Sequence, residues 1–251
     1  MGSRTQYRLL ITALTGALLV EMGLAIASED PAIRPYEATY QISYKGRIVG
    51  RSEFSLQYDE YGNHYQFSST SSFHGLLRFI APKPLIQRSV FLSKEGTITP
   101  LEFWFEDGSN SGRDNIHIIF DWNEDLATVI SAEQQNQYPI TQNTLDPGTI
   151  QVQFMLDLAR SASLNNYTLV DENGLKTYSN VVESDQRVQT ALGKFSTRAF
   201  VQEREGSSRQ TLIWAAPKLH QLPVRIEQKN DSETQTVFLL ESINWRSNLA
   251  K

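Results

Sequence analysis

The chain has 251 residues, a formal net charge of −5 and no cysteine, and its aromatic residues comprise 10 tyrosines, 12 phenylalanines and 4 tryptophans. The mildly acidic balance, without a basic stripe, gives no reason to expect a nucleic-acid partner. The lack of cysteine excludes disulfides, thiol catalysis, zinc–thiolate sites and iron–sulfur clusters, so the fold depends on its apolar core.

The first 27 residues have the pattern of a secretory signal peptide. Arg4 and Arg8 precede the apolar run 9–20, and the small residues of 25–27 follow it. A basic n-region, an apolar h-region and an A-x-A site are typical of a cleaved signal. An uncleaved membrane anchor is the alternative, but Glu21 ends the uncharged run well short of the about 20 residues that a spanning helix needs. We expect an exported mature chain that does not span the membrane.

The stretch from Tyr36 to Tyr58 predicts a β-hairpin. Apolar residues alternate with polar ones on two arms joined at Lys45-Gly46-Arg47. Period-two alternation around a glycine turn is a strong hairpin signal, because Gly46 can adopt the positive φ that a tight turn needs. The predicted apolar face consists of Tyr36, Ala38, Tyr40, Ile42 and Tyr44 on the first arm and Ile48, Gly50, Ser52, Phe54, Leu56 and Tyr58 on the second.

Short alternating segments continue along most of the chain. Strands are predicted at 64–73 and 85–92, then from 101 to 131, and in a second series from 167 to 245. No internal repeat or low-complexity linker divides the sequence. The pattern predicts an all-β, mainly antiparallel fold: one barrel-like or strongly curved sheet of about eleven to thirteen strands with one or two short helices. We expect residues 28–251 to form this single domain.

One amphipathic helix is predicted at 148–159. Apolar residues recur there at three- and four-residue spacing, as Ile150, Phe154, Met155 and Leu158. Asp146 is placed to cap the helix, and Pro147 suits its first position.

The segment Phe73–Ile80, with the sequence FHGLLRFI, breaks the alternation of the strands. Leu76, Leu77 and Ile80 fall at helical spacing, and the prolines within 81–84 end any helix. Two interpretations stay open: a short helix that plugs one end of the sheet, or a mobile apolar lid.

Two motifs in the second half carry a family resemblance. A turn Leu192-Gly193-Lys194-Phe195 precedes the ending Trp214-Ala215-Ala216-Pro217, which continues after a short gap as Leu222-Pro223-Val224-Arg225. Over roughly 36–245 the chain resembles an exported bacterial family, domain of unknown function 3108. The resemblance implies a β-rich protein of the periplasm or cell envelope of a Gram-negative bacterium and supplies no catalytic residues. Purely structural roles for Gly193, Trp214 and Pro223 are the alternative interpretation.

Catalytic motifs are missing from the sequence. The histidines, His64, His74, His117 and His220, have no metal-ligand spacing, and no G-x-S-x-G or phosphate-binding loop occurs. Carboxylate pairs such as Glu102 and Glu106 fit a solvated strand face. We therefore expect no enzyme activity, no cofactor and no metal; a hydrolase with an unrecognised site is a remote alternative.

The apolar strand faces and the FHGLLRFI segment favour a binding protein. A curved sheet can enclose a hydrophobic or amphipathic ligand, such as a lipid, an acyl chain or an exported polypeptide. The candidate ligand-binding residues are Phe73, His74, Leu76, Leu77 and Phe79. The alternative is an envelope assembly factor that pairs a protein partner through an exposed sheet edge.

Overall fold

The computed structural model describes residues 33–246, with the exception of 60, 62, 80, 133, 161–163, 165 and 232. The expected signal peptide, residues 1–27, lies outside the described residues.

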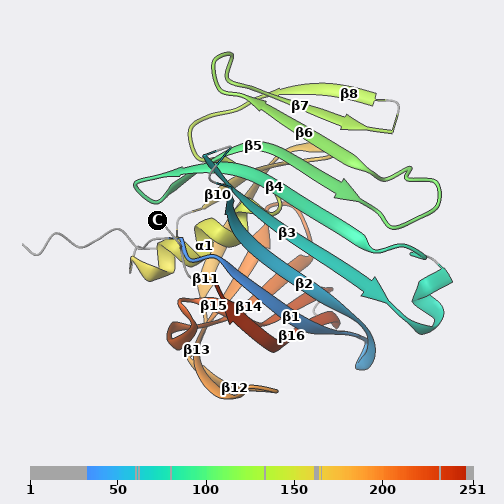
Figure 1. The fold of residues 1–251 in the computed structure, drawn as a ribbon, viewed down its shortest axis with the longest axis vertical. Coiled ribbons are helices and arrows are strands. Elements are labelled where there is room, and N and C mark those ends of the chain that lie inside the picture. The colour runs from blue at the N-terminus through green and yellow to red at the C-terminus, as the bar shows by residue number, and fades with distance from the viewer. Residues whose placement is uncertain are drawn as a thin grey trace, which may run out of the picture.

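A single sheet of 16 strands dominates the structure (Figure 1). In the first half the strands are β1 (Tyr36–Tyr44), β2 (Arg47–Asp59), β3 (His64–Phe73), β4 (Leu85–Lys94), β5 (Thr97–Glu106), β6 (Ile116–Asp121), β7 (Leu126–Ser131), β8 (Gln134–Pro139) and β9 (Thr144–Leu145). In the second half they are β10 (Tyr167–Asp171), β11 (Gly174–Val182), β12 (Gln186–Thr190), β13 (Gly193–Arg204), β14 (Arg209–Ala216), β15 (Leu222–Asn230) and β16 (Glu233–Trp245). The helices are α1 (Thr149–Ala159) and two 3₁₀ turns, η1 (Gly75–Phe79) and η2 (Pro217–Leu219).

The strand order is β8-β7-β6-β5-β4-β3-β2-β1-β16-β15-β14-β13-β11-β10-β9, with β12 paired to β13. Pairing is antiparallel except between β9 and β10. The first and last long strands, β1 and β16, are neighbours, so the sheet has an N-terminal wing, β2–β8, and a C-terminal wing, β9–β16. We expected about eleven to thirteen strands, and that count was too low.

The predicted opening hairpin is confirmed. Lys45 and Gly46 form its turn with φ of 46° and 76°, and β1 pairs with β2 on one side and β16 on the other. Along β1 every second side chain from Tyr36 to Ile42 is buried. The alternation therefore identified the inner face of the sheet, because only one face of these strands packs against the core.

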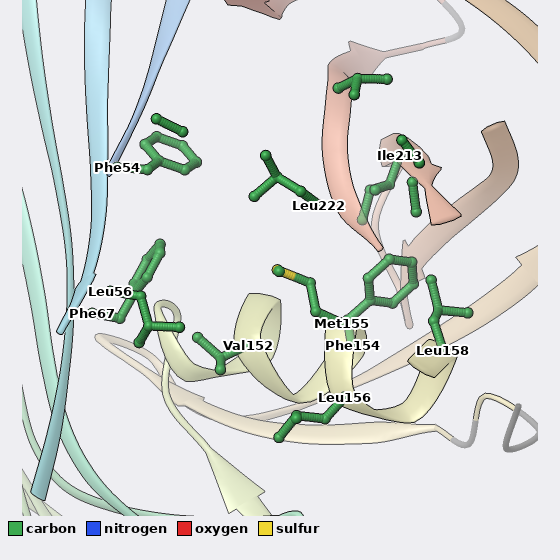
Figure 2. Close-up of a cluster of buried hydrophobic side chains, with 14 of the residues drawn as sticks. Phe54, Leu56, Phe67, Val152, Phe154, Met155, Leu156, Leu158, Ile213 and Leu222 are labelled. Carbon is green, nitrogen blue, oxygen red and sulfur yellow. The ribbon is translucent and has the colours of Figure 1, made fainter. Parts of the chain in front are cut away.

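Helix α1 lies against the inner face, between the two wings (Figures 1 and 2). Its start is fixed by Asp146: the carboxylate Oδ1 accepts hydrogen bonds from the N–H groups of Gly148 and Thr149, at 2.8 and 2.9 Å. In return the Thr149 hydroxyl accepts one from the N–H of Asp146, at 2.9 Å. This reciprocal arrangement satisfies amides that a helix start leaves open, as the sequence predicted for Asp146.

The apolar side of α1 fills the main core. Figure 2 shows Phe154 and Met155 directed toward Ile213 and Leu222 of the C-terminal wing, while Val152 lies nearer Leu56 and Phe67 of β2 and β3. The rings of Phe154 and Phe200 meet edge to face, with centroids 5.2 Å apart. The helix thus packs against both wings at once.

The sheet curls until its ends meet, but it is not a closed barrel. Val170 of β10 packs into a second apolar cluster with residues of β5, β6 and β7, namely Phe103, Ile118, Phe120, Ala127 and Val129, and β9 lies beside β5. Among the described residues, no ladder joins β8 to β9. Side chains, and not backbone hydrogen bonds, connect the two ends of the sheet. Of the two expected forms, barrel-like or strongly curved, the structure shows an open, strongly curved sheet.

The sequence did not predict two of the strands, β8 and β9, for physical reasons. Strand β8, Gln134–Pro139, has mostly exposed polar residues, so it shows no apolar alternation. Strand β9 has only two residues, too few for any period. Between β3 and β4, the FHGLLRFI segment contains η1, a short helix at the end of the sheet; Ile80 lies outside the described residues.

Candidate functional site

An apolar cavity of about 530 Å³ lies between the wings, beside the start of α1. None of the described residues that line it is charged. Its apolar lining consists of Ile42, Tyr44, Val49, Phe54, Phe73, Leu77, Leu85, Phe105, Pro147, Ile150, Phe154, Ile213, Pro223, Ile226 and Phe238. The polar lining consists only of Ser, Thr and Gln side chains: Ser69, Ser71, Gln87, Gln151, Gln202, Thr211, Gln228 and Thr236.

Strand register builds the C-terminal wall from two parallel rows. The first is apolar and crosses four strands through the paired residues Ile213, Ile226, Phe238 and Ile42. Two residues further along each strand, the second row carries the polar residues Gln202, Thr211, Gln228 and Thr236 and ends at Tyr44. The wall therefore changes from apolar to amide- and hydroxyl-bearing as it approaches the β1–β2 turn.

The N-terminal wall is a similar row across β2, β3, β4 and β5. Phe54 is paired with Ser69, Ser69 with Gln87, and Gln87 with Phe105. Large aromatic rings stand at the ends of this row and small or flexible polar side chains at its middle, which leaves space between the wings. The side chains of Ser69 and Gln87 are hydrogen-bonded to each other, at 3.3 Å.

Gly50 allows the cavity wall to extend onto β3. It stands between Ile42 and Phe73 in the sheet, and a Cβ at this position would lie 2.2 Å from the Ser72 carbonyl oxygen and 3.2 Å from the Phe73 ring. Only glycine permits so close an approach of the neighbouring backbone.

A buried carboxyl group lies directly behind the cavity. Asp146 precedes the lining residue Pro147 and is fully buried. The Ser89 hydroxyl donates to its Oδ1 at 2.6 Å, and Oδ2 has no hydrogen-bond partner among the described residues. Burial raises the pKa of Asp146 to about 6, although the hydrogen bonds from Ser89, Thr149 and Gly148 act in the opposite direction.

The five candidate residues from the sequence separate into two groups. Phe73 and Leu77 line the cavity. His74, Leu76 and Phe79 are exposed, outside the lining. The segment that the sequence marked as one apolar unit therefore presents two faces, one toward the cavity and one toward solvent.

Most of the lining was missed at the level of sequence. The sequence places Ile42 and Phe54 on the apolar face of the hairpin and Phe238 in a strand, and it assigns none of them to a cavity. Alternation shows which face of a strand is inward, whereas a cavity depends on which inward side chains lack a partner on the opposite wing. That information arises only from the curvature of the sheet.

Two of the histidines, His117 and His220, make local contacts outside the cavity lining. His117 stacks on Trp104 with centroids 5.0 Å apart, and its Nε2 is 3.9 Å from the carboxylate of Glu102. The side chain of His220 meets Arg34 at 3.2 Å, and burial together with Arg34 lowers its pKa. In the described part of the chain no three His, Asp or Glu side chains are grouped as metal ligands would be.

The same described residues contain no helix with the length and apolar character needed to cross a bilayer.

Comparison with known families confirms the resemblance to domain of unknown function 3108. The model of the family described as protein of unknown function (DUF3108) matches residues 39–239. The chain belongs to the DUF3108 family. The match includes every described residue that lines the cavity, from Ile42 to Phe238, so the cavity lies within the DUF3108 domain. No curated protein matches the sequence.

One solved structure supports the fold of this DUF3108 protein. A β-barrel-like protein of the domain of unknown function DUF1849 from Brucella abortus is similar, with a TM-score of 0.56 and 11% identity, covering 86% of this chain and 99% of that one. At this identity the likeness concerns the fold alone. Looser likenesses include the Pseudomonas aeruginosa MucA/MucB complex, with a TM-score of 0.40, 10% identity, 87% of this chain and 54% of that one. Another is an exported protein with a YmcC-like fold from Bacteroides fragilis, with a TM-score of 0.37, 16% identity, 85% of this chain and 97% of that one.

Proposed function

We propose that this DUF3108 protein is a non-enzymatic binding protein of the periplasm that holds the acyl chain of an envelope lipid between the wings of its sheet. The observation that carries the proposal is the uncharged cavity of about 530 Å³. This volume falls in the range of about 300 to 1,000 Å³ that is typical of small-molecule sites. The expected signal peptide supports the periplasmic location.

The lining favours an acyl chain over a polar ligand. Ile42, Ile213, Ile226 and Phe238 present a continuous hydrocarbon surface, and transfer of each methylene group from water to such a surface is favourable by about 0.8 kcal/mol. A charged headgroup would lack a counter-charge among the described lining residues, so it would remain outside. The Gln and Thr row near the β1–β2 turn is suited to the uncharged ester or amide part of a lipid.

Native mass spectrometry of protein recovered from a bacterial periplasm tests the proposal. We expect a lipid-sized adduct that organic extraction removes and that a fluorescent fatty acid replaces. The Thr211→Trp substitution places a large side chain in the cavity and should abolish the adduct. Gln210→Trp is the matched control, because Gln210 is the neighbouring residue on the opposite face of β14 and lies outside the lining.

An adduct of equal occupancy in Thr211→Trp and in Gln210→Trp would contradict the proposal. A peptide in place of a lipid would identify an exported polypeptide as the ligand instead.

Pairing of a protein partner through a sheet edge is the second candidate function. It rests on β8, which ends the strand order and exposes most of its side chains. An edge strand of this kind offers free backbone groups to an added strand. Gln135 is paired with Ile130, next to the hydrogen-bonded pair Ser131 and Gln134 that closes the two-residue turn, so its N–H points to the free edge of β8. Replacing Gln135 with proline would remove that backbone donor and should abolish capture of such a partner while leaving the lipid adduct intact.

A further inference from the structure

Four large apolar side chains are exposed together beside the cavity. On the β1–β2 hairpin, Tyr44 is 40% exposed and Ile48 57%; on η1, Leu76 is 82% exposed and Phe79 85%. Single exposed apolar residues are ordinary, but neighbouring ones indicate a contact surface. We call these residues, with the basic residues described next, the rim.

The two loops of the rim are joined through the backbone. The N–H of His74, just before η1, donates to the carbonyl of Val49 at 2.9 Å. Gly50 and Phe73 are paired in adjacent strands. Tyr44, Val49, Phe73 and Leu77 all line the cavity, so the rim borders the place where the cavity reaches the surface.

The charge of the rim is opposite to that of the whole chain. Lys45, Arg47 and Arg78 are exposed, and the sequence has no acidic residue in 43–50 or 72–84 although its net charge is −5. The Lys45 ammonium lies 5.7 Å from the centre of the Tyr44 ring. Lys83 is not part of the rim, because its charge is directed to Asp107. Burial raises the pKa of Asp107, but hydrogen bonds from Ser109 and Asp114 and the positive charge of Lys83 lower it by more.

We propose that the rim is a membrane-docking surface for anionic phospholipid. Leu76 and Phe79 would enter the boundary between headgroups and acyl chains, while Arg47 and Arg78 would contact the phosphates. Apolar side chains interleaved with basic ones on protruding loops fit this interface, since binding grows with buried apolar area and with attraction to anionic lipids. The charge of the rim favours an anionic bilayer over a neutral one.

The proposal stands on the exposed loops and does not require that the cavity hold a lipid. Different substitutions test the two proposals. Leu76 and Phe79 lie outside the cavity lining, so their replacement tests membrane docking, whereas Thr211 lies within the lining, so its replacement tests lipid binding.

Vesicle co-sedimentation tests the docking surface. Protein is recovered from a bacterial periplasm, and its N-terminus is determined by mass spectrometry. We expect sedimentation with vesicles of phosphatidylethanolamine and phosphatidylglycerol, and weak sedimentation with phosphatidylcholine alone. The double substitution L76S/F79S should weaken binding at least about tenfold, without loss of the cavity adduct. Leu192→Ser is the matched control. Leu192 is 46% exposed in the β12–β13 turn, at the end of β13 away from Gln202, which belongs to the same cavity row as Tyr44 of the rim.

Charge reversal gives the second arm of the experiment. R47E/R78E should weaken binding to anionic vesicles by about tenfold or more, and R187E/K194E, which reverses two exposed charges on the strands β12 and β13, should not. Wild-type protein that fails to sediment with anionic vesicles, or that sediments equally with phosphatidylcholine, overturns the proposal. Unchanged binding of L76S/F79S overturns it as well.

Discussion

The hydroxyl of Ser89, on β4, donates a 2.6 Å hydrogen bond to Oδ1 of Asp146, the residue that caps α1. One carboxyl group thereby connects the N-terminal wing to the helix that packs against both wings. Because Asp146 is fully buried, its protonation state affects the stability of the whole arrangement.

We expect the fold to lose stability as the pH rises through the titration of Asp146. Its pKa is raised from 3.8 to about 6 in the folded state, so the folded protein binds this proton more tightly than the unfolded chain does. The contribution is fully present below about pH 4 and is lost by about pH 6, with a size of about 3 kcal/mol. Asp146→Asn should lack this part of the pH dependence of the unfolding free energy, measured by urea denaturation. Ser89→Ala retains the carboxyl group and should retain the dependence; identical pH profiles for wild type and Asp146→Asn would contradict the prediction.

Replacing Gly50 by alanine should destabilise the fold by about 1 to 3 kcal/mol. The added Cβ would lie 2.2 Å from the Ser72 carbonyl oxygen, a backbone atom that cannot turn aside as a side chain can. Gly46→Ala is the control: nothing lies within 4 Å of its Cβ position and its φ is 76°, so the cost is limited to backbone strain of about 1 kcal/mol. Thermal unfolding followed by circular dichroism compares the two. If Gly50→Ala lowers the stability no more than Gly46→Ala does, β2 and β3 can move apart at Gly50 at little cost in free energy, and the prediction is wrong.

Two adjacent leucines of η1 should behave differently. Leu77→Ser introduces a polar group into the cavity lining and should reduce retention of a fluorescent fatty acid by about three- to tenfold. Leu76→Ser changes only an exposed side chain and should leave retention unchanged. Equal effects of the two substitutions would mean that the lining described here does not hold the ligand.

Tyr40→Phe should cost about 1 to 3 kcal/mol of stability. The Tyr40 hydroxyl donates to the carbonyl of Pro223 at 2.8 Å, in a buried position that links β1 to β15. The substitution would leave that carbonyl without its donor. Urea denaturation gives the measurement, and Tyr44→Phe, at an exposed position, serves as the control. A difference between the two below about 0.5 kcal/mol would indicate that water replaces the lost hydroxyl.

Sequence alone predicted the parts of the fold that depend on local pattern. The hairpin around Gly46, the capping role of Asp146 and a helix at 148–159 follow from alternation, turn chemistry and helical spacing. In the structure the helix begins one residue later, at Thr149. Strand β8 could not be predicted, because its polar residues carry no apolar period. The cavity could not be predicted either, since the space between Phe54 and Phe238 depends on how far the sheet curves. Nor could the pattern distinguish Leu76 from Leu77, whose directions are set by the geometry of a 3₁₀ turn.

The way in which the wings meet determines how the cavity could change its width. On the side away from β1 and β16, residues 140–143 connect β8 to β9, and among the described residues no ladder joins these two strands. The packing between the wings there comes from side chains, with Val170 among the residues of β5–β7 and Tyr138 against Gly174. A ladder resists separation because every step breaks a backbone hydrogen bond, whereas apolar side chains can slide over one another at small cost. We expect the amides of β8 and β10 to exchange with solvent earlier than those of β1 and β16. The hydrogen-bonded strands around β1 and β16 would then stay fixed, and the cavity would widen by separation of the side-chain contacts between β5–β7 and β10.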